Sequence, residues 1–136
     1  VYAMKPVKGM EIDPDQVMEF INKILDNFNV STIVFDVNMY PGIKKRLRER
    51  GYLVKQHIVR KKDYDNFKEK LYNGKVILPN HHKLIEEMRS LQVVNEKRVD
   101  HPRGGSKDIL DAVVNVFLEL SKNLEERIPY LVVAGI

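Results

Sequence analysis

A short apolar run that ends in an acidic residue is the feature that most constrains the fold of this chain. Residues 31–35 read Ser-Thr-Ile-Val-Phe, and Asp36 follows directly. Such a run predicts a buried β-strand. Because residues 33–35 are apolar without alternation, we expect the strand to be central in its sheet and covered on both faces. It would carry the Asp36 carboxylate to the edge of that sheet.

A second acidic pair lies in residues 100–112, DHPRGGSKDILDA. Ser106 is expected to cap a long apolar helix that ends near residue 124. Asp108 and Asp111 are three residues apart, so they share a face of this helix. An acid in a first turn is also favourable with the helix dipole, which explains Asp108 well and Asp111 less well. The two glycines before Ser106 are expected to serve the backbone conformation that enters the helix.

Strand and helix signals alternate along the chain, and this predicts an α/β layered domain. The length of 136 residues fits a single domain with a real core. The expected helix starts are Asp13 with Pro14, Pro41, Asp63, Asn80 and Ser106; the expected strands are residues 1–7, 31–35, 52–59, 75–78 and 130–134, with a hairpin formed by residues 91–95 and 98–100.

The composition excludes several classes of site. The chain has no cysteine, so it can form neither a disulfide framework nor a thiolate zinc site. No apolar run is long enough to span a bilayer and no signal peptide is visible, so we expect no membrane association. The adjacent histidines 81 and 82 would point to different helix faces, so we predict no metal site there, and we expect His101 to hold its own loop.

Basic residues cluster in residues 44–50, and the net charge is +4. Lys44, Lys45 and Arg48 belong to this cluster, which can neutralise phosphates of a nucleic acid. The alternative is a solvated helix face that has no ligand.

Carboxylates that converge from a strand end and a helix start are typical of a divalent-metal phosphodiester site. Hard Mg²⁺ and Mn²⁺ ions prefer oxygen ligands. Asp36 and Asp108 are therefore the first candidates for metal ligands.

Four segments, in this order, resemble the C-terminal nuclease domain of the large terminase subunit of tailed bacteriophages. The resemblance covers most of the chain, and its last segment is the most specific. The segments are residues 33–36 (IVFD), 47–52 (LRERGY), 78–84 (LPNHHKL) and 100–112 (DHPRGGSKDILDA).

The resemblance implies a ribonuclease-H-like fold: a layered mixed sheet flanked by helices. It implies a metal-dependent endonuclease that cuts concatemeric double-stranded DNA during genome packaging, with two Mg²⁺ or Mn²⁺ ions about 4 Å apart. Asp36, Asp108 and Asp111 would be the catalytic metal ligands. The residues expected to contact the DNA backbone are Lys44, Lys45, Arg48 and Lys107.

The resemblance also implies the portal protein and the small terminase subunit as partners, in the host cytoplasm of a phage or prophage. The first strand of the fold, its acidic ligand and the ATPase domain are absent from residues 1–136, and no Gly-rich phosphate-binding lysine motif occurs. We therefore expect a single, N-terminally truncated nuclease domain that is poorly active alone. Its open sheet edge would be filled by residues 130–134, by strand exchange in a dimer, or by an upstream segment.

Two alternatives remain open. The first is another ribonuclease-H-like nuclease, of the resolvase or transposase type. The second is a nonenzymatic DNA-binding or assembly remnant, which would bind DNA without Mn²⁺-dependent cleavage.

Overall fold

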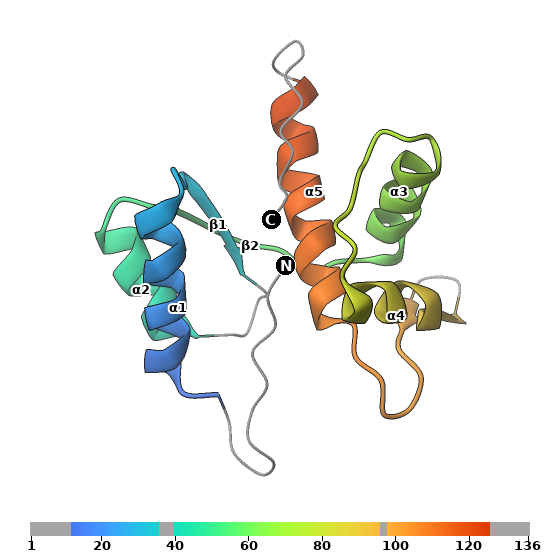
Figure 1. Ribbon diagram of the computed structural model, residues 1–136, viewed down its shortest axis with the longest axis horizontal. Helices are drawn as coiled ribbons and strands as arrows, with labels where there is room; N and C mark the ends of the chain where they lie inside the picture. Colours follow the sequence, from blue (N-terminus) through green and yellow to red (C-terminus); the bar gives the residue numbers. More distant parts are fainter. Residues whose placement is uncertain (1–11, 36–39, 96–97, 126–136) are drawn as a thin grey trace. The chain divides into compact units, whose positions relative to one another are not determined.

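The structure, a computed structural model, describes residues 12–35, 40–95 and 98–125. Within them, five helices and four strands form a mixed α/β chain (Figure 1), which confirms the predicted class. The chain divides into two compact units, an N-terminal unit of Ala3–Ile58 and a C-terminal unit that begins at Val59. Each unit has its own apolar core.

In the N-terminal unit, helix α1 (Pro14–Asn27) begins as the sequence predicts. Asp13 Oδ1 accepts a hydrogen bond from the backbone N–H of Asp15 at 2.9 Å. Pro14 stands at the first position, where its missing N–H costs nothing. The helix buries Met18 in the core of the unit.

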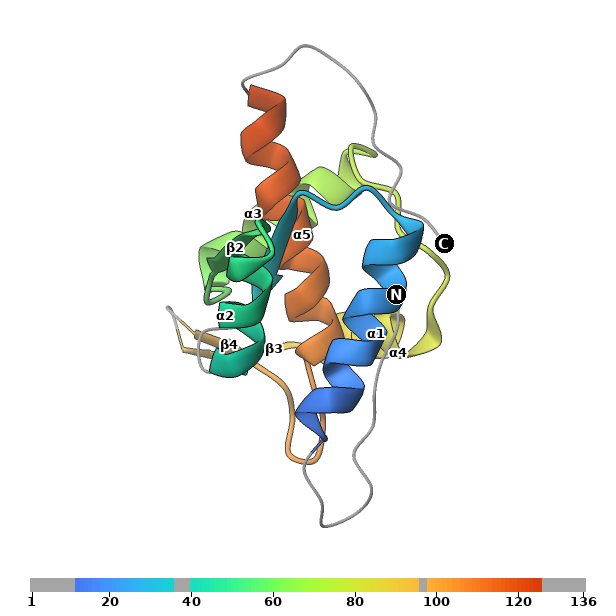
Figure 2. The same cartoon turned by 90° about the vertical axis from the view of Figure 1, so that its left-hand side faces the viewer.

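Strands β1 (Thr32–Phe35) and β2 (Leu53–Gln56) pair in parallel, with Ile33 opposite Val54. Parallel strands need a crossover connection, and helix α2 (Pro41–Glu49) provides it. Figures 1 and 2 show α1 and α2 on the same side of the two strands.

Helix α2 begins at Pro41 and is followed by Gly51, as predicted. Gly51 has a φ of 90°, a conformation that only glycine adopts without strain. Leu47, which is fully buried, anchors α2 in the core of this unit. The other buried apolar residues of this core are Met18, Ile43 and Val54.

The strand predicted at residues 31–35 is confirmed, one residue shorter. Each of its four residues is only half-buried. In the described part of this unit both helices cover the same face, so the expectation of cover on both faces is not met there. The strands expected at residues 1–7 and 130–134 lie outside the described residues.

In the C-terminal unit, α3 (Lys61–Tyr72) and α4 (His82–Ser90) pack against α5 (Asp108–Glu125) (Figure 1). The rings of Phe67 and Phe117 meet edge to face, with centroids 5.3 Å apart. Among the described residues, the core of this unit contains six buried hydrophobic residues: Tyr64, Phe67, Leu84, Ile109, Leu110 and Val114.

The predicted hairpin is also confirmed. Strands β3 (Gln92–Asn95) and β4 (Arg98–Asp100) pair antiparallel, with Val93 opposite Val99. The hairpin leads from the end of α4 to the loop that precedes α5.

The strand predicted at residues 75–78 is wrong. The segment does have the in–out alternation of a strand, because Val76 and Leu78 pack against the core while Ile77 is exposed. In the described part of the chain, however, this segment pairs with no other strand. A strand is defined by its backbone partner, which a single segment cannot reveal.

Two of the predicted helix caps are also corrected. Helix α3 begins two residues before Asp63, and Asp63 Oδ2 instead reaches back to the N–H of Arg60 at 2.8 Å. The N-cap of α4 is His81 instead of Asn80, since His81 Nδ1 accepts from the N–H of Leu84 at 3.3 Å. At α4 the neighbouring side chain of His81 satisfies an orphan donor of the first turn, whereas at α3 Asp63 satisfies the N–H of the capping residue, Arg60.

Within the described residues, no helix combines the length and apolarity that crossing a lipid bilayer requires.

Candidate functional site

The loop before α5 makes a tight turn that its glycines permit. The N–H of Gly105 donates to the carbonyl of Pro102 at 2.8 Å, and Gly104 between them has a φ of 80°. A Cβ added at Gly105 would lie 3.1 Å from the same carbonyl. The glycines therefore serve the backbone conformation, as predicted.

Asp108 is the first residue of α5, and its side chain is exposed. Ser106 Oγ accepts from the N–H of Asp108 at 3.3 Å and lies 3.2 Å from Asp108 Oδ2, to which it can donate. The helix begins two residues after the predicted cap, but Ser106 does bond to its first turn. The Asp108 carboxylate is thus exposed, while the backbone of Asp108 is held by its hydrogen bond to Ser106.

The carboxylate of Glu87, on α4, is buried beneath this helix start. Its Oε1 accepts from Ser106 Oγ at 3.0 Å and its Oε2 accepts from the N–H of Leu110 at 2.9 Å. Glu87 is not among the site residues predicted from the sequence. The signal was present, because Glu87 falls on the helical spacing of three inward apolar residues, Leu84, Met88 and Leu91.

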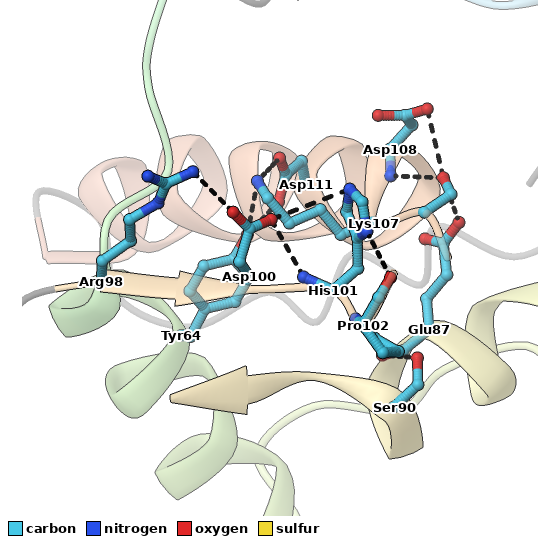
Figure 3. Close-up of polar contacts among 11 residues, drawn as sticks. Tyr64, Glu87, Ser90, Arg98, Asp100, His101, Pro102, Lys107, Asp108 and Asp111 are labelled. Carbon is cyan, nitrogen blue, oxygen red and sulfur yellow. Dashed lines mark hydrogen bonds and ion pairs between the residues drawn. The ribbon is translucent and has the colours of Figure 1, made fainter. Parts of the chain in front are cut away.

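Asp111 is half-buried and is engaged through both oxygens (Figure 3). The Tyr64 hydroxyl donates to its Oδ1, and Lys107 Nζ donates to its Oδ2 at 2.5 Å. Lys107 Nζ also lies 3.4 Å from the Tyr64 oxygen and 6.0 Å from the centre of its ring. Burial raises the pKa of Tyr64, and the hydrogen bond to Asp111 raises it further.

Asp108 and Asp111 therefore have different environments, although they share one helix. Figure 3 shows the Asp108 carboxylate directed away from the group formed by Asp111, Lys107 and Tyr64. The predicted pair is close in sequence, but the two carboxylates do not converge.

Asp100, at the end of β4, holds the same loop from its other side. Its Oδ1 accepts from the N–H of His101 at 3.0 Å, and its Oδ2 pairs with Arg98 at 2.6 Å. The hydrogen bond from His101 and the charge of Arg98 lower the pKa of Asp100. His101 Nδ1 lies 2.9 Å from the carbonyl of Pro102. His101 therefore contacts its own loop, as predicted.

The adjacent histidines 81 and 82 make separate local contacts. His81 caps α4, and His82 is exposed with its Nδ1 3.7 Å from Glu86. Among the residues that the structure describes, no three His, Asp or Glu side chains cluster closely enough to hold a metal ion. Asp36, the first predicted ligand, lies outside the described residues, directly after β1.

The basic segment of α2 divides into buried and exposed residues. Lys44 is only 5% exposed, whereas Lys45 and Arg48 are exposed. Lys45 Nζ lies 3.9 Å from Glu49, a weak surface pair. The exposed basic surface of α2 thus includes Lys45 and Arg48 but not Lys44.

Comparison of this chain with protein-family models, curated proteins and solved structures returns no match.

The two aspartates of the α5 start differ in the oxygens that they leave open to a ligand. Asp108 offers carboxylate oxygens on an exposed and anchored side chain. Both oxygens of Asp111 already accept hydrogen bonds, so Asp111 would bind a metal only if Lys107 or Tyr64 moved away. At the α5 start, Asp108 is therefore the exposed carboxylate, and Asp111 is held by its neighbours Lys107 and Tyr64.

Proposed function

We propose that this chain is the nuclease part of a viral DNA-packaging terminase, a divalent-metal endonuclease that cuts concatemeric double-stranded DNA. The observation that carries the proposal is the exposed Asp108 carboxylate at the start of α5. Ser106 accepts a hydrogen bond from the N–H of Asp108, and Glu87 accepts one from the N–H of Leu110 in the same turn. This helix start lies in residues 100–112, the segment that most resembles the terminase family.

Asp36 and Asp108 are the proposed ligands of two Mg²⁺ or Mn²⁺ ions. Asp36 directly follows β1, whose pairing with β2 is parallel. Residues beyond the carboxyl ends of parallel strands commonly form ligand sites. When bound, such ions stabilise the negative charge that develops during phosphodiester hydrolysis.

Asp111 is proposed to act through Lys107 and not as a direct ligand of the ions. It holds the Lys107 ammonium in place through a short ion pair. A lysine held in this way next to Asp108 supplies positive charge for a DNA phosphate without reading the base sequence. Lys45 and Arg48 would contact the DNA backbone by the same chemistry.

The finer fold and the partners belong to the same proposal. The chain would have a ribonuclease-H-like nuclease fold, a layered mixed sheet flanked by helices. The portal protein and the small terminase subunit would be its partners in packaging, in the host cytoplasm.

A plasmid-cleavage assay on the complete gene product that contains this chain tests the proposal. Mn²⁺-dependent cleavage is expected, and Asp36→Asn or Asp108→Asn should abolish it. Each substitution removes the charge of a metal ligand but keeps the size of the side chain, so the protein should remain folded. Asp65→Asn is the matched control, since Asp65 is an exposed helical aspartate that pairs with Lys61.

Each outcome separates the alternatives. Preference for branched DNA over linear or plasmid DNA would favour a resolvase-type nuclease. Salt-dependent DNA binding without cleavage at any Mn²⁺ concentration would indicate a nonenzymatic module. Full activity of the Asp108→Asn variant would overturn the assignment of the site.

A further inference from the structure

The sequence contains a single Asn-Gly pair, residues 73 and 74, and it stands in the turn that ends helix α3. Asn73 closes the helix with a φ of −81° and a ψ of 7°, and Gly74 follows with a φ of 66°. Both residues are exposed. Because glycine adopts a positive φ without strain, the geometry of this turn favours glycine directly after an exposed asparagine.

An asparagine followed by glycine has a chemistry of its own. The side-chain carbonyl carbon of the asparagine and the backbone nitrogen of the next residue can close a five-membered ring. A side chain on that next residue hinders the closure, and glycine has none. A Cβ added at Gly74 would meet no atom within 4 Å beyond its neighbours in the chain, so the space around this residue is open to water.

The last turn of α3 holds the nitrogen that would close this ring. The N–H of Gly74 donates to the carbonyl of Leu71 at 3.1 Å, and the N–H of Lys75 donates to the carbonyl of Lys70 at 2.9 Å. Ring closure requires this turn to open, because the Gly74 nitrogen must turn away from Leu71 and toward the Asn73 side chain. Helix ends fray at little cost in free energy, so the turn opens frequently.

We propose that Asn73 is a site of spontaneous deamidation, controlled by the opening of the last turn of α3. The Gly74 nitrogen attacks Cγ of Asn73 and a new C–N bond forms. The bond from Cγ to the side-chain nitrogen breaks, and this nitrogen leaves as ammonia with the proton of the Gly74 N–H. Solvent water then hydrolyses the cyclic imide at either of its carbonyls, which gives aspartate or isoaspartate. This inference does not depend on the proposed function.

Both products alter the end of α3. Each adds a negative charge to a chain whose net charge is +4, and it does so at the helix end where the dipole disfavours anions. Isoaspartate also lengthens the main chain between residues 73 and 74, which disrupts the hydrogen bonds that Gly74 and Lys75 donate. Deamidation therefore loosens the last turn of α3.

The test is incubation of the complete gene product at mildly alkaline pH, followed by tryptic digestion and mass spectrometry. Trypsin releases residues 71–75 as one peptide, since Lys70 precedes it and Lys75 ends it. This peptide should show the mass gain of an amide converted to a carboxylic acid, and it should separate into aspartate and isoaspartate forms. Because helix ends open easily, the native protein should react within about tenfold of the rate of the urea-unfolded protein.

Two other asparagines are internal controls, because neither precedes glycine and both side chains are hydrogen-bonded. Asn22 accepts from Arg50 at 2.7 Å, and Asn27 donates to the carbonyl of Lys23 at 2.6 Å. Both should remain amides during the same incubation. Equal conversion at either position would overturn the proposal, since it would show that Asn73 has no special reactivity.

Two variants test the chemistry. Gly74→Asn keeps a residue that tolerates a positive φ but places a side chain beside the reacting nitrogen, so residue 73 should convert more slowly. Asn73→Gln should remove the conversion, because its longer side chain would have to close a larger ring. A wild-type rate in Gly74→Asn would overturn the attack by the Gly74 nitrogen. Conversion of residues 71–75 only after unfolding in urea would also overturn the proposal, because the turn would then protect Asn73 completely.

Discussion

Lys107 Nζ lies 2.5 Å from Asp111 Oδ2, one helical turn away, and the two side chains are 23% and 19% exposed. The Tyr64 hydroxyl, from α3, donates to the other oxygen of Asp111. Asp111 is thus held by Tyr64 of α3 and by Lys107, the residue just before α5, whereas Asp108 is exposed. This difference separates the expected effects of substituting the two aspartates.

Asp111→Asn should lower the free energy of unfolding by about 2 kcal/mol. This value lies between the 0–1 kcal/mol of exposed ion pairs and the roughly 3–5 kcal/mol lost when one partner of a fully buried pair is removed. Cleavage should fall less than in Asp108→Asn. Urea denaturation measures the first effect. Asp65→Asn, which breaks a more exposed pair with Lys61, should cost under about 1 kcal/mol; an equal cost in both variants would contradict the prediction.

Tyr64→Phe should make the protein less stable at neutral pH and less sensitive to alkaline pH. Loss of a hydrogen bond to a charged group costs about 1.5–3 kcal/mol. The pKa of Tyr64 is raised above its ordinary value of 10.0, first by burial and then by Asp111. The folded chain therefore keeps this proton longer than the unfolded chain, so the stabilisation is complete below pH 10 and is lost as the pH rises above it.

Urea unfolding from pH 7 to pH 11 measures this dependence. Tyr72→Phe is the control, because Tyr72 is 79% exposed. The decline in stability above pH 10 should be shallower in Tyr64→Phe than in Tyr72→Phe or the wild type. The same slope in all three proteins would show that Tyr64 does not contribute to it.

Glu87→Ala should destabilise the C-terminal unit by about 1–3 kcal/mol, because the N–H of Leu110 loses its acceptor in a buried setting. The neighbouring Glu86 is the natural comparison. It is exposed and makes only long surface pairs, with His82 at 3.7 Å and Lys83 at 3.9 Å. Glu86→Ala should change the unfolding free energy by less than about 1 kcal/mol. Equal effects in chemical denaturation would mean that the hydrogen bond from the Leu110 N–H to Glu87 contributes no stability.

Joint substitution of Lys45 and Arg48 by alanine should weaken DNA binding by a similar factor for every sequence. Phosphate contacts carry no base information. The slope of log affinity against log salt should become shallower by about two, roughly one for each lost contact. Lys75→Ala, which removes an exposed lysine outside α2, should leave the slope unchanged.

Lys44→Ala should act through stability instead. Lys44 is 5% exposed, so its removal disturbs packing in the N-terminal unit more than it removes surface charge. Thermal unfolding should shift to lower temperature while the salt slope of DNA binding stays the same. A shallower salt slope of DNA binding with unchanged stability would contradict this prediction and indicate that Lys44 contacts DNA.

The sequence alone determined the features that depend on neighbours within a few residues. Asp13 and Pro14 start α1, Gly51 follows α2 at a positive φ, and the glycines of the loop before α5 make its turn. Each follows from a local steric or hydrogen-bonding requirement. The inward apolar stripes of α3 and α4 were predictable for the same reason, since helical spacing is a local property.

Only the tertiary structure decided which polar groups meet. The partner of Asp111, Tyr64, lies 47 residues away in the chain. The spacing of Glu87 places it on the inward face of α4, but only the packing of α5 brings Ser106 and Leu110 to its carboxylate. Lys44 is buried while its neighbour Lys45 is exposed, and this difference depends on the core of the N-terminal unit. Residues 75–78 have the alternation of a strand but lack a strand partner within the described residues. The periodicity of apolar residues in the sequence specifies which residues face inward. It does not specify which atoms they contact there, because those atoms belong to groups distant in sequence.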